Sequence, residues 1–183
     1  MHFLETYALV AAAKISKPFI QEEEIDLPKG PYITFHPSHS KGTARQYDYW
    51  DKVINNLKES NISQEIIQVG EVNDSKYEIN TSYLGLTTYN SLAYLIKNAD
   101  LHLGYDSLPV HLASHYNKKI VALYPHWVES SGPYFSEPKD IRILEPDFST
   151  IKPCYSYNDP HRLLNTINPE LIVSSVIELL NEI

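Results

Sequence analysis

The sequence predicts an α/β fold: a single Rossmann-like three-layer domain with a mainly parallel sheet and helices on both faces. Short apolar, β-prone runs recur along the chain, and the segments between them carry apolar residues at helical spacing. Strands that alternate with helices in this way form βαβ units, whose strands run parallel. The length of 183 residues suffices for one domain with a real core and is too short for two full Rossmann-type domains.

Five strands are expected, each a short run of apolar residues, at 32–35, 66–69, 101–103, 120–123 and, more weakly, 141–144. Helices are expected where apolar residues recur three and four apart, over 3–14, 49–57, 92–96 and directly after 107. The last helix has a clear start, with Asn168 as its N-cap, Pro169 as its first residue and Glu170 in its first turn. We therefore expect an amino-terminal helix and linker over 1–29 and the Rossmann-like domain over 30–183.

Composition excludes several classes of protein. With 43% hydrophobic residues and both signs of charge, the chain is typical of a soluble globular protein. A formal net charge of −8 argues against non-specific nucleic-acid binding, because phosphate backbones are bound by Lys and Arg. The single Cys154 rules out an intramolecular disulfide and fits a reducing compartment. Because neither a membrane span nor a signal peptide is evident, we expect a cytoplasmic protein without a nucleic-acid partner.

The strongest candidate site follows the strand at 101–103, where the chain turns into a helix. Asp106 and Ser107 stand at that turn, and ligands of open parallel sheets bind at the carboxyl ends of the strands. The Ser107 hydroxyl and the backbone N–H groups at 107–109 are candidate donors to a phosphate, which helix N-termini attract. The alternative is that Asp106 or Ser107 only caps the helix. His111 follows within the first two turns, as a ligand contact or as a hydrogen-bonded structural residue.

Two further polar loops follow strands that we expect to be neighbours. The loop 36–45 carries hydroxyls, a glycine and two cations, the composition of a phosphate-facing loop, and its candidate residues are Ser38, Ser40, Lys41 and Arg45. It lacks the order of a P-loop, and a plain mobile loop is the alternative. Glu71, after the strand at 66–69, is a candidate acceptor from ribose hydroxyls or an ordinary exposed acid. All three loops are expected to converge at one edge of the sheet.

Other chemistries do not assemble in this sequence. It contains no GxSxG elbow, no HExxH, no CxxC pair and no GxGxxG. His111 and His115 are four residues apart, a spacing that two zinc ligands on a helix can have, but no third ligand is evident. We therefore expect neither a metal nor a cofactor.

Five motifs follow one another along the chain: YITFHP at 32–37 with Trp50, IQVGE at 67–71, LT at 86–87, LGYDSLPVHLA at 103–113 and KIVALY at 119–124. This ordered set resembles glycosyltransferase family 9, the heptosyltransferase-like proteins. The resemblance covers roughly residues 30–182. It implies the carboxyl-terminal half of a GT-B fold, in which two Rossmann-like domains face a cleft and this half binds a nucleotide-sugar donor, often an ADP-heptose, without a catalytic metal.

The resemblance also implies roles for individual residues. Asp106, Ser107 and His111 would contact the diphosphate and the sugar, whereas Ser40, Lys41 and Arg45 would donate to the phosphates. Glu71 would bind the ribose, and Thr87 would lie beside the base. One residue departs from the family pattern, because Leu108 stands where the family usually has Gly, so it presents a bulkier wall to the ligand.

The expected function is therefore binding of a nucleotide-diphosphate sugar for sugar transfer. The amino-terminal acceptor domain of such enzymes has no counterpart in these 183 residues, so we expect either a fragment of a longer protein or a chain whose acceptor side is supplied by a partner polypeptide or a homo-oligomer. Two alternatives stay open. One is a non-catalytic nucleotide or nucleotide-sugar binding module with a regulatory role, and the other is a degenerate domain retained for protein interaction.

Overall fold

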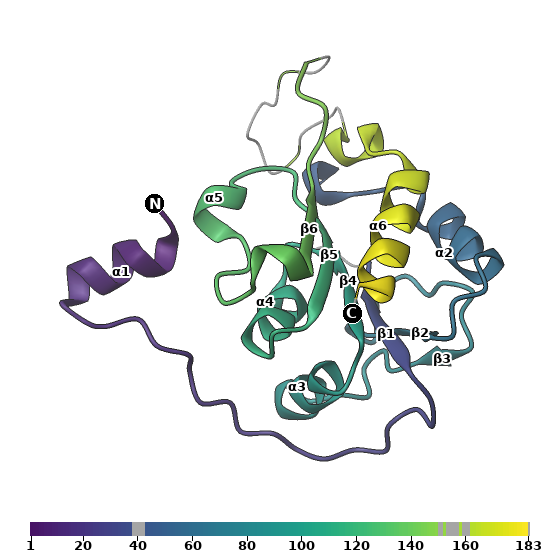
Figure 1. The fold of residues 1–183 in the computed structure, drawn as a ribbon, viewed down its shortest axis with the longest axis horizontal. Helices are drawn as coiled ribbons and strands as arrows, with labels where there is room; N and C mark the ends of the chain where they lie inside the picture. Colours follow the sequence, from purple (N-terminus) through teal and green to yellow (C-terminus); the bar gives the residue numbers. More distant parts are fainter. Residues whose placement is uncertain (38–42, 150–151, 153–157, 159–161, 183) are drawn as a thin grey trace.

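The strands form one parallel sheet. The computed structural model describes residues 1–37, 43–149, 152, 158 and 162–182 (Figure 1). Within these residues the sheet contains β1 (Tyr32–His36), β2 (Glu65–Gln68), β3 (Thr81–Ser82), β4 (Leu101–Tyr105), β5 (Lys119–Leu123) and β6 (Ile141–Leu144). Their order is β3-β2-β1-β4-β5-β6, and every pairing is parallel. This is the strand order of the doubly wound Rossmann fold, with its switch point between β1 and β4.

Helices cover both faces of this sheet (Figure 1). The α-helices are α1 (Phe3–Ala11), α2 (Trp50–Glu59), α3 (Tyr89–Lys97), α4 (Leu108–His115), α5 (Val128–Ser131) and α6 (Pro169–Asn181). Short 3₁₀ turns are η1 (Thr43–Arg45), η2 (Pro138–Asp140) and η3 (Leu163–Thr166). One face is covered by α2 and α6, and the other by α3 and α4. The predicted three-layer α/β/α architecture is confirmed.

Two apolar clusters hold the layers together, one on each side of the sheet. Because successive strand residues point to opposite faces, Phe35 packs with Trp50 of α2 on one side, whereas Tyr32 packs with α3 on the other. Phe35 and Trp50 meet edge to face, with ring centroids 5.1 Å apart. Each fully buried large apolar side chain contributes roughly 1.5–3 kcal/mol relative to its exposure to water. The two clusters therefore fix the central strands and, with them, the loops at their carboxyl ends.

Helices α3 and α6 each begin at a residue whose side chain caps the helix. The Asn168 side chain accepts a hydrogen bond from the Glu170 N–H at the start of α6, as predicted. Thr88 is the N-cap of α3, and it exchanges reciprocal hydrogen bonds with Ser91. This capping fixes α3 beside the sheet edge at which β2 ends.

The amino-terminal segment lies along the domain as a helix and an extended linker (Figure 1). Helix α1 buries none of its residues. Between α1 and β1, the linker is attached to the helices beside it: Lys17 donates to Asn117 at 2.8 Å, and Glu22 pairs with Lys97 at 2.8 Å. Glu23 accepts from the Thr88 hydroxyl at 2.7 Å. The division between linker and domain at residue 30 stays a prediction.

No helix in the described part of the chain is both long and apolar enough to cross a membrane.

Candidate functional site

A cleft of about 780 Å³ lies at the carboxyl ends of β1, β2 and β4, beside the switch point of the sheet. All three predicted polar loops contribute to it: His36, Arg45, Gly70, Glu71, Asp106 and Ser107. Asp74 also lines the cleft, and the other lining residues are more apolar: Val72, Gly85, Thr87, Thr88, Tyr89, Leu92, Leu108 and Pro109. The predicted convergence of the three loops is therefore confirmed for the described residues. A volume of this size accommodates a small organic ligand, since such pockets measure roughly 300–1,000 Å³.

Arg45 and Asp106 form an ion pair at the centre of the cleft. The Arg45 guanidinium donates to the Asp106 carboxylate at 2.9 Å and to the Asp106 backbone carbonyl at 3.1 Å. The Asp106 side chain is only 12% exposed, whereas that of Arg45 is 32% exposed. Arg45 comes from η1 and Asp106 from the turn after β4, so the pair links the first and third loops. Its exposed guanidinium leaves donors available to an anion in the cleft.

Ser107 occupies the N-cap position of α4, but its side chain makes no capping hydrogen bond. Instead its hydroxyl donates to the Tyr105 carbonyl at 3.0 Å and lies 3.1 Å from His36 Nδ1. The interpretation of this side chain as a simple helix cap is therefore wrong. Pro109, two residues further on, has no N–H, so of the three backbone groups expected to bind an anion, only those of Ser107 and Leu108 can donate.

His36 is the last residue of β1, and it pairs in register with Gly104 of β4. A Cβ atom on Gly104 would lie only 2.7 Å from the His36 carbonyl oxygen, so the close approach of the strands here requires glycine. Burial lowers the pKa of His36 to about 4, although the Asp74 carboxylate acts in the opposite direction. The ring is therefore neutral at pH 7.

The second loop is shaped by Asp74. Its carboxylate accepts from the Glu71 N–H at 2.8 Å, and a Cβ on Gly70 would overlap it at 2.3 Å. Gly70 itself adopts a φ of 150°, which few other residues can reach. The turn exposes the Glu71 side chain at the rim of the cleft. Glu71 was among the predicted site residues, but Asp74 was not. The turn-forming residues Asn73 and Asp74 directly after a strand were the available indication.

The other predicted site residues have different outcomes. Ser38, Ser40 and Lys41 lie outside the described residues. Thr87 lines the cleft, and its place beside the base stays a prediction. His111, with 44% of its side chain exposed, has its Nε2 3.6 Å from Asp106 Oδ1, and it lines a neighbouring apolar hollow rather than the cleft. Leu108 lines both, so the residue that replaces the family's glycine forms the wall between them.

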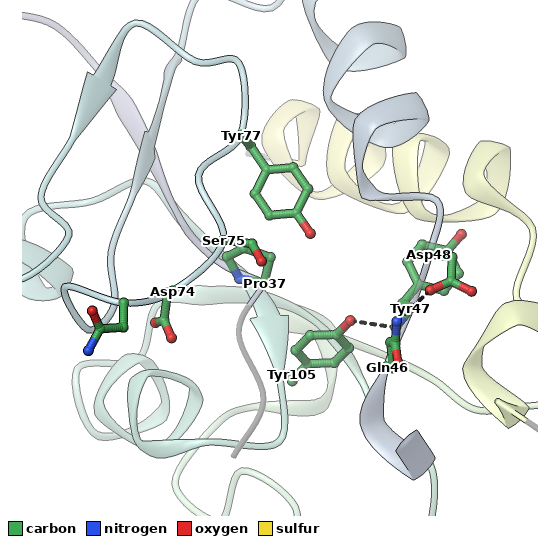
Figure 2. Close-up of a pocket in the computed structure, with 9 residues that line it drawn as sticks. Pro37, Gln46, Tyr47, Asp48, Asp74, Ser75, Tyr77 and Tyr105 are labelled. Atoms are coloured by element: carbon green, nitrogen blue, oxygen red, sulfur yellow. Dashed lines mark hydrogen bonds between the residues drawn. The ribbon is translucent and has the colours of Figure 1, made fainter. Parts of the chain in front are cut away.

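A smaller polar hollow of about 370 Å³ shares Asp74 with the cleft, and Figure 2 shows the residues that line it. Tyr105 contributes its hydroxyl, which accepts hydrogen bonds from the Tyr47 N–H at 2.9 Å and from Trp50 Nε1 at 2.7 Å. Figure 2 shows this tyrosine opposite Tyr77 across the hollow. Tyr47, Trp50 and Tyr105 all belong to the apolar cluster between the sheet and helices α2 and α6, so the network lies in the core next to the end of β4.

The described side chains give little support for a metal site. No three His, Cys, Asp or Glu residues gather there in an arrangement that could hold an ion, and Cys154 lies outside the described residues. The expectation of a metal-free site stays a prediction.

The class of protein follows from a comparison with family models. Residues 4–142 match the model of glycosyltransferase family 9 (heptosyltransferase). Because this match spans most of the sequence, the chain belongs to glycosyltransferase family 9. A search of curated proteins gives no match.

Solved structures with the same fold include a glycosyltransferase family 9 protein of Veillonella parvula, with 19% sequence identity and a TM-score of 0.65 over 83% of this chain and 47% of that protein. They also include the ADP-heptose LPS heptosyltransferase II of E. coli, with 18% identity and a TM-score of 0.64 over 96% of this chain and 50% of that enzyme. A third is the dodecameric, iron-containing heptosyltransferase TibC of E. coli in complex with ADP-D-β-D-heptose, with 14% identity and a TM-score of 0.61 over 85% of this chain and 46% of TibC. The chain thus spans about half the length of these proteins.

Proposed function

We propose that this chain binds a nucleotide-diphosphate sugar of the ADP-heptose type and forms the donor-binding half of a glycosyltransferase. The observation that carries the proposal is that Arg45, Ser107 and Glu71 meet in one cleft at the switch point of a family 9 fold. This combination supplies a cation and a hydroxyl for phosphate together with a carboxylate for ribose. Structural relatives support the choice of sugar nucleotide, because one was solved with ADP-D-β-D-heptose.

The chemistry of the side chains suggests how the ligand is divided among them. The diphosphate would lie near Arg45, the Ser107 hydroxyl and the N–H groups of Ser107 and Leu108, which are all donors. The ribose would lie near Glu71. The base would then lie against the apolar wall that includes Val72 and Leu92.

Asp106 has a different task in this scheme. A carboxylate repels phosphate, but it accepts hydrogen bonds from sugar hydroxyls, and here it also holds Arg45 at 2.9 Å. We therefore assign Asp106 to the transferred sugar. When the bond between sugar and diphosphate breaks, negative charge grows on the departing nucleoside diphosphate. Arg45 and Ser107 would stabilise that charge. This stabilisation would be the main contribution of the donor-binding half to catalysis.

The acceptor and the general base would come from outside this half. A further domain, a partner polypeptide or a second copy of the chain would each fit, and TibC illustrates oligomerisation in a relative. We propose that the reaction needs no metal and takes place in the cytoplasm, as the sequence predicts. Turnover of a sugar nucleotide by the purified chain as a monomer would contradict the proposal that the acceptor side is supplied from outside this half.

The direct test is binding of ADP, GDP, UDP, CDP and their sugars, screened by thermal shift and quantified by calorimetry. A ligand at a hundred times its dissociation constant stabilises the folded state by about 2.7 kcal/mol. Arg45→Ala should weaken ADP binding by about tenfold or more, because a hydrogen bond to a charged group contributes about 1.5–3 kcal/mol. Lys52→Ala is the matched control, since it also removes a cation from an ion pair, with Glu170, but lies away from the cleft.

Asp106→Ala separates the sugar from the diphosphate. We expect it to weaken an ADP-sugar more than ADP itself, because only the sugar loses an acceptor. Equal weakening would show that Asp106 acts only by holding Arg45. If no nucleoside diphosphate or its sugar shifts the melting curve, the proposed function is wrong.

A further inference from the structure

The two contacts of the Ser107 hydroxyl together indicate which neighbour receives its proton. A hydroxyl carries one proton and two acceptor sites. The Tyr105 carbonyl, 3.0 Å away, can only accept, so the Ser107 proton is donated to it. The contact of 3.1 Å between Ser107 Oγ and His36 Nδ1 therefore requires a proton on Nδ1. His36 is the donor in this pair, and Ser107 the acceptor.

The surroundings of His36 maintain this arrangement. The ring is held at the end of β1 by the pairing of His36 with Gly104, where a Cβ would not fit. Burial keeps the ring neutral, with a pKa lowered to about 4. A neutral imidazole has one N–H, and the Ser107 contact uses it at Nδ1. The Nδ1–H therefore points at Ser107 Oγ.

A phosphate oxygen that enters the cleft changes only one of these two bonds. The Ser107 hydroxyl can turn its proton from the Tyr105 carbonyl toward the anion, because a charge-assisted hydrogen bond is stronger than a neutral one. The bond from His36 Nδ1–H stays in place and fills an acceptor site of the same oxygen. Without that donor, Ser107 has no partner to hold its oxygen once its proton leaves Tyr105.

We propose that His36 is a positioning residue for the diphosphate: it donates from Nδ1 to Ser107 Oγ and so keeps the Ser107 hydroxyl aimed at a phosphate oxygen. This inference deepens the proposed function and rests on it. His36 acts through Ser107 rather than on the ligand, so its effect should depend on Ser107 and on the presence of phosphate.

The test compares ADP with adenosine, which differ only in the diphosphate, by calorimetry on the full chain. His36→Leu removes the donor at similar volume, and His36→Asn keeps an amide N–H near the place of Nδ1–H. We expect His36→Leu to weaken ADP binding about tenfold, the effect of one lost hydrogen bond, and to leave adenosine binding within twofold. His36→Asn should restore most of the lost affinity for ADP.

A double-mutant cycle with Ser107→Ala supplies the second readout. In the Ser107→Ala background, His36→Leu should change ADP affinity by less than twofold. The ratio of ADP to adenosine affinity is measured within each variant, so partial loss of folded protein does not alter it. Equal weakening of both ligands, an undiminished effect without Ser107, or failure of His36→Asn to restore binding overturns the positioning role. If the wild-type chain binds adenosine and ADP with equal affinity or binds neither, the proposed function itself fails, and the positioning role with it.

Discussion

Removal of one hydroxyl, in Tyr105→Phe, tests whether the network beneath the cleft holds its loops in place. The hydroxyl accepts from the Tyr47 N–H at 2.9 Å and from Trp50 Nε1 at 2.7 Å. These three residues are 1–3% exposed, so neither donor can turn to bulk water. A buried donor left without an acceptor costs about 1–3 kcal/mol, so two such donors cost about 2–6 kcal/mol. This is a large part of the roughly 5–15 kcal/mol by which domains are stable.

The assay is urea unfolding followed by tryptophan fluorescence, with the free energy of unfolding compared between variants. Two other Tyr→Phe substitutions serve as comparisons, with one lost hydrogen bond and, among the described residues, with none. Tyr47→Phe removes only the hydrogen bond of 2.9 Å from the Tyr47 hydroxyl to the Ile167 carbonyl, so it should lower the free energy of unfolding by about 1 kcal/mol. Tyr49→Phe alters an exposed residue, 44% accessible, and should stay within about 0.5 kcal/mol of the wild type. A cost below about 0.5 kcal/mol for Tyr105→Phe would refute the reasoning, because it would mean that water satisfies both donors.

Three further predictions concern the glycine, the histidines and the last helix. Gly104→Ala should destabilise the chain by about 1–3 kcal/mol in urea unfolding, because its Cβ would lie 2.7 Å from the His36 carbonyl oxygen and 3.1 Å from His102 Nε2. Burial lowers the pKa of His36 to about 4 and that of His102 to about 3. When the pH falls below 6.5, the ordinary pKa of histidine, the unfolded chain therefore binds more protons at these rings than the native chain does. Between pH 7 and pH 5, each of the two rings should lower the free energy of unfolding by about 2 kcal/mol. Asn168→Ala should cost about 1 kcal/mol in the same assay, because the Glu170 N–H loses its side-chain acceptor.

Each of these predictions has its own control. Gly30→Ala should be neutral, since no atom lies within 4 Å of its added Cβ, and equal costs at both glycines would contradict the steric argument. His102→Asn keeps a polar atom near Thr34 Oγ1 but does not titrate, so its stability should fall less on acidification than that of the wild type. An unchanged acid dependence would mean that other groups cause it. Asn80→Ala, at an exposed turn, controls for Asn168→Ala, and a similar small effect of both would remove the capping explanation.

The central strands could be predicted from sequence because they are buried on both faces and therefore form continuous apolar runs. Strands β1, β4 and β5 lie where those runs were found. The edge strand β3 was not predicted, because it consists of Thr81 and Ser82 only and pairs with β2 alone. Two polar residues carry no periodicity, so a strand of this kind is defined by its neighbour rather than by its own sequence.

The loops of the site could be predicted, but the directions of their side chains could not. Parallel topology brings the ends of β1, β2 and β4 to one edge, so the presence of Arg45 and Ser107 there followed from their positions after strands. The Arg45–Asp106 pair joins residues 61 apart in the sequence, which no local pattern reveals. Likewise, the Ser107 side chain points toward His36 rather than capping α4, and the orientation of the His111 side chain depends on its position around α4.

The contacts of the amino-terminal linker limit how far α1 can move from the cleft. Lys17 is tied to Asn117 at the end of α4, so only residues 12–16 separate this attachment from the last residue of α1. The six residue-to-residue steps from Ala11 to Lys17 span at most about 22 Å when fully extended. Any surface that covers the exposed side of α1 is therefore held within a short radius of α4, the helix whose first turn borders the cleft. The linker thus sets a maximum separation between that surface and the nucleotide site.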